Sequence, residues 1–182
     1  MRAFIAVDLP GYLKDKITRL VKDFAECGLT FRWVKTKNLH LSLKFLGDIE
    51  TSQIDEIKQV ITKIAGSFKT FTIGFDNFGF FPNQRKPRIF FIDASKRGLL
   101  EDIARKLEEE LEILGFKKEG RFKSHITLAR IKDLKNIDCL KNKIKHIKLG
   151  ETFPVAGITL YESILTGEGP IYEEIFSSNL TT

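Results

Sequence analysis

The chain of 182 residues is 42% hydrophobic, so it is long and apolar enough to bury a core without disulfides or metals. Its net charge of +6 and its pI of about 9.3 favour an anionic partner, of which nucleic acid is the commonest. Cys27 and Cys139 are too few and too far apart in sequence to predict a disulfide framework or a zinc site. No apolar run approaches the ~20 residues of a membrane span, and the N-terminus has no signal-peptide pattern, which predicts a cytoplasmic protein.

The first half of the chain is predicted to run strand, helix, strand, strand, helix. Asp8-Leu9-Pro10 offers the first helix start, Gly28 offers its stop, and Ser52 can cap the second helix. Apolar residues recur at helical spacing after each of these starts, whereas β-forming residues fill the segments around them. The predicted strands cover residues 2–7, 31–35 and 39–46, and the helices lie between 10 and 28 and between 52 and 64.

The second half repeats this order of elements. Ser95 is predicted to cap a helix whose apolar stripe ends before Gly115, and residues 132–147 have a weaker helical pattern. The predicted strands cover residues 70–75, 88–93, 125–131, 153–165 and 172–176. Because no low-complexity linker separates the halves, residues 1–182 are predicted to form a single domain of two closely packed lobes.

Two of the three histidines lie in matching strands of alternating apolar residues. Residues i and i+2 of a strand project from the same face, so His40 lies beside Ser42 and His125 beside Thr127. The leucines and isoleucine between them point the other way, into a core. Packing of the lobes about a pseudo-twofold axis brings both strands to one central cleft.

Two facing imidazoles suit an in-line displacement at phosphorus. An imidazole titrates near pH 6.5, so one of the pair can accept a proton from the attacking oxygen while the other donates a proton to the departing oxygen. Ser42 and Thr127 can hydrogen-bond the non-bridging phosphate oxygens as charge develops, and Arg130 supplies a fixed cation near the end of its strand. A metal site is a poorer interpretation, because no third ligand has a suitable spacing.

Simpler explanations apply to several of these features. One His-x-Ser or His-x-Thr segment alone is usually structural, and it is the second copy that favours catalysis. Phe45 and Tyr172 are predicted to pack rather than to stack on a base, and His146 is predicted to be solvated. A further segment interleaves aromatic and basic residues that can stack on RNA, although core packing is the favoured interpretation for each aromatic ring: Phe78, Phe80, Phe81, Arg85, Lys86 and Arg88.

The resemblance to a known family is carried by motifs along nearly the whole chain. They are the opening residues 1–8, Trp33-Val34, residues 40–47, Phe80-Phe81-Pro82 with Pro87-Arg88, residues 125–130 and Gly169-Pro170-Ile171-Tyr172. The sequence resembles the two-histidine phosphoesterase superfamily, in the branch called RNA 2′,3′-cyclic phosphodiesterase or 2′-5′ RNA ligase. This resemblance implies an α+β bilobal fold, with two pseudo-symmetric antiparallel-sheet lobes, helices outside, a central cleft, and neither metal nor cofactor.

The same resemblance implies hydrolysis of RNA 2′,3′-cyclic phosphate ends to 2′-phosphates, with His40 as proton donor and His125 as proton acceptor. Ser42, Thr127 and Arg130 are then the phosphate-binding residues. Attack by an RNA 5′-hydroxyl in place of water yields a 2′-5′ linkage, so reversible ligation is a further expectation. The chain departs from the family pattern at Ser42, where threonine is commoner, and at Ser124, where proline is frequent.

Two other functions remain open at this stage. One is an RNA- or nucleotide-binding module of the same fold that holds the phosphate with little turnover. The other is an end-sealing protein in RNA processing, for which an RNA 5′-hydroxyl outcompetes water. The expected partner in each case is an RNA end, no membrane is involved, and the protein is expected to be a monomer.

Overall fold

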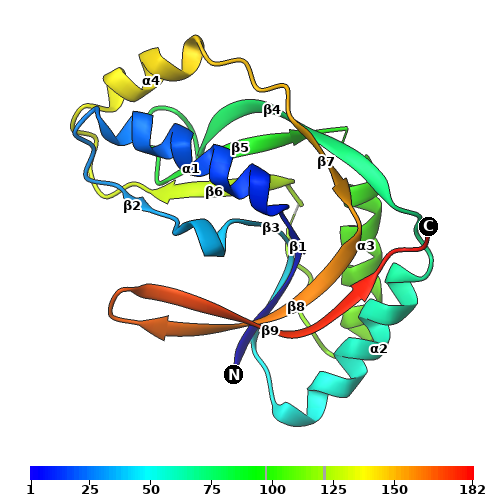
Figure 1. Ribbon diagram of the computed structural model, residues 1–182. Helices are drawn as coiled ribbons and strands as arrows, with labels where there is room; N and C mark the ends of the chain where they lie inside the picture. Colours follow the sequence, from blue (N-terminus) through cyan, green and yellow to red (C-terminus); the bar gives the residue numbers. More distant parts are fainter. Residues whose placement is uncertain (97, 121) are drawn as a thin grey trace.

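The computed structural model describes residues 1–96, 98–120 and 122–182, and these form two antiparallel sheets (Figure 1). In spatial order, sheet A consists of β3 (His40–Asp48), β1 (Arg2–Asp8), β8 (Gly157–Thr166) and β9 (Gly169–Asn179). Sheet B consists of β2 (Arg32–Trp33), β6 (His125–Arg130), β5 (Ile89–Ser95), β4 (Phe71–Phe81) and β7 (Thr152–Val155). The predicted α+β fold with two antiparallel-sheet lobes is confirmed.

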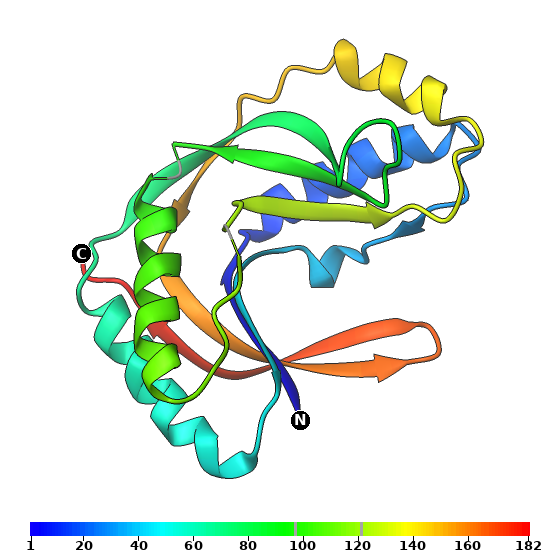
Figure 2. The same cartoon turned by 180° about the vertical axis from the view of Figure 1, so that it is seen from behind.

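The helices lie outside the two sheets. They are α1 (Gly11–Ala25), α2 (Ile54–Ala65), α3 (Gly98–Ile113) and α4 (Ile137–Lys145), with short 3₁₀ turns at Thr36–Asn38 and Thr51–Gln53. Phe24 of α1 packs edge-on against the rings of Phe78 and Phe90, which places this helix on sheet B. Figure 2 shows α2 and α3 side by side, and both contact strands of sheet A. No helix in the described ranges is long and apolar enough to cross a membrane.

The two lobes do not correspond to the two halves of the sequence. Sheet A combines β1 and β3 from the start of the chain with β8 and β9 from its end, and β1 pairs directly with β8. The strand predicted at 153–165 is in fact two strands separated at Ala156, where the chain passes from sheet B to sheet A. The order of elements therefore repeats along the sequence, but each sheet does not consist of the strands of one half of the chain alone.

Burial follows the periodicity of each element. Residues Ala3 to Val7 of β1 are all buried, because this strand is flanked by β3 and β8 and covered on both faces. In α2 the buried residues recur three and four positions apart: Ile57, Val60, Ile61 and Ile64. Burying one such side chain stabilises the fold by about 1.5–3 kcal/mol. The buried side chains of both sheets belong to one hydrophobic cluster, so the lobes share a core.

Two predicted boundaries are wrong for identifiable reasons. β4 continues to Phe81 rather than ending at 75, because a bulge between Phe75 and Phe78 accommodates the polar pair Asp76-Asn77 at exposed positions. Ser95 is the last residue of β5 and α3 begins at Gly98, so the predicted helix cap is a strand residue.

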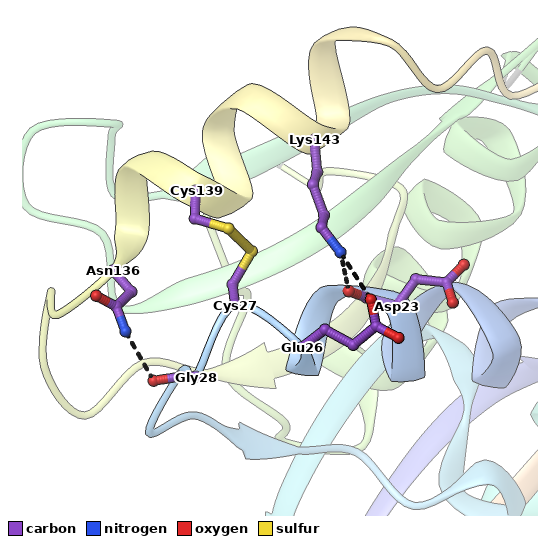
Figure 3. The surroundings of a disulfide bond; sticks show 7 residues. All are labelled: Asp23, Glu26, Cys27, Gly28, Asn136, Cys139 and Lys143. Carbon is purple, nitrogen blue, oxygen red and sulfur yellow. Dashed lines mark hydrogen bonds and ion pairs between the residues drawn. A yellow bond between two sulfur atoms is a disulfide. The ribbon is translucent and has the colours of Figure 1, made fainter.

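The expectation that the cysteines are too far apart to pair is also wrong. Cys27 follows α1 and Cys139 lies in α4, and the two helices pack side by side outside sheet B (Figure 3). Their Cα atoms are 5.8 Å apart and the two sulfurs are bonded. Lys143 adds an ion pair with Glu26 at 3.2 Å to the same helix contact. The separation in sequence did not prevent the two cysteines from pairing, because the fold places α4 beside α1.

Reduction of this disulfide is expected to destabilise the protein. It closes a loop spanning a separation of 112 residues, and cross-linking such a loop contributes about 2–5 kcal/mol through the entropy of the unfolded chain. Urea unfolding with and without dithiothreitol should show a correspondingly lower midpoint in the reduced protein. The variant Cys27→Ser/Cys139→Ser is the control, because its midpoint should not respond to reductant. A wild-type midpoint that is equally unresponsive would contradict the expectation.

Candidate functional site

The two motif strands lie against each other where the sheets meet. β3 carries His40 and Ser42 in sheet A, and β6 carries His125 and Thr127 in sheet B. In both strands the residues between them are buried, so the histidine and the hydroxyl share the open face, as the alternation predicts. A cleft of about 150 Å³ is lined by all five residues predicted for the site: His40, Ser42, His125, Thr127 and Arg130.

Each imidazole is oriented by a backbone carbonyl two residues earlier in the chain. His40 Nδ1 lies 2.7 Å from the carbonyl oxygen of Asn38, and His125 Nδ1 lies 2.7 Å from that of Lys123. A carbonyl oxygen only accepts, so Nδ1 carries the proton in both rings. Nε2 is therefore the atom left to exchange a proton, and it accepts when the ring is neutral and donates when the ring is charged.

The two histidines differ in their neighbours. Ser42 Oγ lies 2.9 Å from Nε2 of His40, to which its hydroxyl donates while the imidazole is neutral. The His40 ring contacts the rings of Phe4 and Tyr172, at centroid distances of 4.9 and 5.2 Å, and these two rings also contact each other at 4.8 Å. This cluster of three rings on sheet A leaves the imidazole little freedom to rotate.

His125 has a matching aromatic environment from sheet B. Its ring meets Phe81 and Phe91 edge-on, at centroid distances of 4.9 and 5.4 Å, and those two phenyl rings stack on each other at 4.1 Å. Of the interleaved aromatics, Phe80 is buried and Phe78 packs on Phe24 and Phe90, which confirms core packing for both.

Burial lowers the pKa of both histidines below the usual 6.5. For His40 the desolvation is opposed by the Asn38 carbonyl and by the negative charge of Asp8, and reinforced by the charges of Lys14 and His125. For His125 the desolvation is opposed by the Lys123 carbonyl and by the negative charge of Asp93, and reinforced by the charge of the Lys123 side chain. Both imidazoles are therefore mostly neutral at pH 7, and the protonated member of the pair becomes more populated under mildly acidic conditions.

Asp8 is a neighbour of His40 that the sequence did not reveal. It sits directly opposite His40 in the β1–β3 register, and Thr159 and Tyr161 of β8 both donate hydrogen bonds to its carboxylate. Burial and this carboxylate together raise the pKa of Tyr161, so the phenol keeps its proton. Asp93 occupies the corresponding register position opposite His125. No local sequence pattern marks either aspartate, because the pairing of distant strands creates both positions.

A buried lysine fixes the first motif strand to its surroundings. Lys44 is 1% exposed, and its Nζ donates to Glu108 Oε1 and to the carbonyl oxygen of Lys117, both at 2.6 Å. Glu108 also accepts from the backbone N–H of Glu119. One ammonium group thus ties β3 to α3 and to the segment that leads into β6, and its burial is tolerated because the charge is paired.

The tip of the β8–β9 hairpin, which projects from sheet A (Figure 1), also lines the cleft. Asn38 Nδ2 donates to the carbonyl oxygen of Pro170 at 2.7 Å, and Lys35 Nζ lies 3.4 Å from Glu168 Oε2. Trp33 and Tyr172 add aromatic surface to the same cleft. Their motifs supported the resemblance, but their place at the site emerges only from the fold. No group of three or more His, Cys, Asp or Glu residues in the described ranges is arranged to hold a metal ion.

Comparison with known proteins identifies the family. The model of the LigT-like phosphoesterase family matches the chain twice, at residues 7–91 and 92–172. The chain belongs to the LigT-like phosphoesterase family. It is 36% identical over 178 residues to a Methanocaldococcus jannaschii protein named RNA 2′,3′-cyclic phosphodiesterase, covering 96% of this chain and 98% of that one. A Thermotoga maritima protein of the same name is 30% identical over 181 residues, covering 97% of this chain and 94% of that one.

Solved structures share the fold of this chain. A Thermus thermophilus crystal structure superposes with a TM-score of 0.83 at 26% identity, covering 99% of this chain and 98% of that one. Apo LigT of E. coli gives a TM-score of 0.77 at 24% identity, covering 100% of this chain and 98% of that one. The two matches to the family model also agree with the repeated order of elements in the two halves of the sequence.

Replacement of Asp8 by asparagine is expected to lower the pKa of His40 further. The carboxylate charge favours the imidazolium, so its removal leaves burial less opposed. NMR titration of the imidazole Cε1–H signals measures the change directly. Asp48→Asn is a matched control, because Asp48 lies at the other end of β3. An unchanged or raised pKa of His40 in the Asp8 variant would show that its carboxylate does not favour the charged ring.

Proposed function

We propose that this LigT-like phosphoesterase hydrolyses RNA 2′,3′-cyclic phosphate ends to 2′-phosphates, with His40 as proton donor and His125 as proton acceptor. The observation that carries the proposal is the shared orientation of the two imidazoles, each with Nδ1 bound to a carbonyl and Nε2 left for proton exchange in one cleft. The relatives named RNA 2′,3′-cyclic phosphodiesterase supply the substrate class.

The proposed reaction is a single in-line displacement. A water oxygen attacks phosphorus and gives its proton to Nε2 of His125, while the P–O3′ bond breaks and Nε2 of His40 protonates O3′. The phosphate remains on O2′, and the two imidazoles have exchanged protonation states. The pair returns to its starting state by proton exchange with water. Chemistry of this kind needs no cofactor.

The remaining cleft residues stabilise the charge that develops on phosphate. The hydroxyls of Ser42 and Thr127 donate to non-bridging oxygens, and Arg130 at the exposed end of β6 attracts the phosphate as a cation. When His40 is protonated, its Nε2–H donates to Ser42 Oγ instead, so this hydrogen bond reverses direction and the Ser42 hydroxyl proton is free to donate to phosphate.

The assignment of His40 as the donor is supported by its charged neighbours. A proton donor must begin as imidazolium, and the Asp8 carboxylate opposite His40 favours that form. At His125 the charge of Lys123, which lowers the pKa, outweighs the opposing charge of Asp93, and this balance favours the neutral, proton-accepting form. The two motifs are equivalent in sequence, so this difference in surroundings is what distinguishes them.

RNA ends are the proposed partner, and the protein is proposed to act as a cytoplasmic monomer folded as one domain over residues 1–182. The net charge of +6 favours RNA in general. A binding module with little turnover is the alternative function. The complete set of acid, base and phosphate-binding groups in one cleft favours catalysis over binding alone.

Hydrolysis of an RNA oligomer ending in a 2′,3′-cyclic phosphate, with EDTA present, tests this proposal. We expect a 2′-phosphate product and a bell-shaped pH profile of kcat/KM with its maximum below pH 6.5. The activity should fall at higher pH because the donor loses its proton, and at lower pH because the acceptor gains one. His40→Ala and His125→Ala should each lower kcat/KM by about 10²–10⁴-fold.

His146→Ala is the matched control, since His146 follows α4 and is remote from the cleft residues. It should retain wild-type activity, and all three variants should show wild-type circular dichroism. Tight binding of the oligomer without turnover would support the binding module instead. Loss of turnover on addition of EDTA would contradict the metal-free mechanism.

A further inference from the structure

The Cys27–Cys139 disulfide joins the end of α1 to the first turn of α4 (Figure 3). Its two ends differ in their access to solvent, because Cys27 is 8% exposed whereas Cys139 is an exposed residue. A disulfide is opened by a thiolate that attacks one of its sulfurs, and exposed disulfides are the ones that exchange most readily. The bond is therefore accessible to thiols in the folded protein, from the side of Cys139.

The start of α4 favours the reduced form of Cys139. This cysteine is the third residue of the helix, and the preceding Asn136 makes no side-chain hydrogen bond to the free N–H groups of the first turn. Those N–H groups and the helix dipole stabilise a thiolate at this end of a helix. A thiolate stabilised in this way is released more readily from a disulfide.

The disulfide is the outermost of a row of contacts between two antiparallel stretches of chain, residues 27–33 and 129–139. β2 and β6 pair where these stretches lie in sheet B, and the contacts continue beyond the end of β6 (Figure 1). In order away from the sheet, the row consists of Trp33 opposite Ala129, Arg32 opposite Arg130, Thr30 hydrogen-bonded to Asp133, Asn136 hydrogen-bonded to Gly28, and Cys27 bonded to Cys139. We call this row the edge ladder.

β2 depends on the edge ladder because it has little pairing of its own. It has two residues at the edge of sheet B, and one further hydrogen bond follows it, from the N–H of Val34 to the carbonyl oxygen of Leu128 at 2.8 Å. Phe31 is buried and its ring lies 5.5 Å from that of Trp33, so a displacement of residues 28–31 reaches the strand. A segment with so few backbone hydrogen bonds opens locally at a low free-energy cost.

The attachment of α4 also depends on the disulfide. Among the described residues, the polar side-chain contacts that this helix makes beyond itself go to the end of α1, where Lys143 donates to the carbonyl oxygen of Asp23 and pairs with Glu26. An ion pair exposed to water adds little to stability. The buried side chains of the helix are Ile137 and Leu140. With the disulfide open, the outer end of the edge ladder therefore loses its strongest contact.

From these observations we propose that the Cys27–Cys139 disulfide is a thiol-exchange site that controls the β2 edge of the cleft. The thiolate of a low-molecular-weight thiol attacks Sγ of Cys139, the bond between the two sulfurs breaks, and Cys27 leaves with the electron pair as a thiolate. A second thiolate attacks the sulfur of the bound thiol and releases Cys139. Two thiols are oxidised to one disulfide, and their two protons pass to the two cysteines. Reduction loosens the edge ladder, and oxidation restores it.

Glutathione tests the site of exchange. Folded wild-type protein is incubated with millimolar reduced glutathione, quenched with acid, alkylated and analysed by peptide mass spectrometry. We expect glutathione on Cys139 and the alkyl group on Cys27 early in the reaction, and both cysteines alkylated at its end. Glutathione on Cys27 instead, or a disulfide that stays closed until urea unfolds the protein, would overturn the proposal.

Trp33 is the single tryptophan of the chain, so its fluorescence reports on β2 directly. We expect reduction with dithiothreitol to raise the constant for acrylamide quenching by at least about twofold at unchanged circular dichroism, because the edge opens locally. The matched control, Cys27→Ser/Cys139→Ser, should show the raised constant with and without dithiothreitol. An unchanged constant in the reduced wild-type protein would overturn the proposal.

Hydrogen exchange of the Val34 amide, followed by NMR in the wild-type protein, provides the same test without a substitution. This amide bonds to the Leu128 carbonyl next to β2, so it should exchange faster in the reduced protein. Equal exchange rates in the two redox states would overturn the proposal even if the double serine variant failed to fold.

The effect on activity rests on the proposed function. Arg32 and Trp33 line the cleft, whereas β6 keeps its pairing with β5 when β2 is loosened. For an RNA oligomer ending in a 2′,3′-cyclic phosphate, reduction should therefore raise KM by at least about threefold and leave kcat within about twofold. An unchanged KM would overturn control of the cleft. Absence of hydrolysis would remove the proposed function, and the glutathione, quenching and exchange measurements would still decide the thiol-exchange site.

Discussion

The hydrogen bond from each imidazole Nδ1 to the carbonyl oxygen two residues earlier is the constraint on which the site depends. It fixes the tautomer of His40 and of His125, so that both Nε2 atoms are left for proton exchange. A side-chain partner in that position would add a charge or a rotamer choice, whereas a backbone carbonyl two residues before the strand does neither. The backbone thus sets the same tautomer for both histidines, whereas the surrounding side chains make their electrostatic environments different.

The interleaved sheets explain how two such strands come to share a cleft. β1 and β8 join the ends of the chain within sheet A, so β3 is held against β6 by strands far apart in sequence. The buried ammonium of Lys44 and the Cys27–Cys139 disulfide tie further distant segments together on either side of the cleft. This arrangement suits proton transfer, which depends on distances that a flexible junction between lobes would not preserve.

The sequence predicted the parts of the site that are local and missed those created by pairing. The alternation in residues 39–46 and 125–131 was enough to place His40, Ser42, His125 and Thr127 on open strand faces, since side-chain direction follows from strand geometry alone. Asp8 and the disulfide were missed because both depend on which distant elements adjoin. The sequence predicted one strand at 153–165 where the structure has two. Its apolar pattern continues across Ala156, although the chain passes from one sheet to the other at that residue. The environment of Ser124 could not be predicted either. Its buried hydroxyl has no hydrogen-bond partner in the described residues, and no feature of the sequence indicates this.

The most direct measurement of the central claim is the tautomer and pKa of each imidazole, by NMR of protein labelled with ¹⁵N-histidine. Only three histidines are present, so single substitutions assign every signal. The account predicts that the neutral rings of His40 and His125 are both protonated at Nδ1 and that both titrate below pH 6.5. A neutral His125 ring protonated at Nε2 would have no free Nε2 to accept the proton of the attacking oxygen, and a neutral His40 ring protonated there would show that the Asn38 carbonyl does not fix its tautomer. Either result would contradict the account.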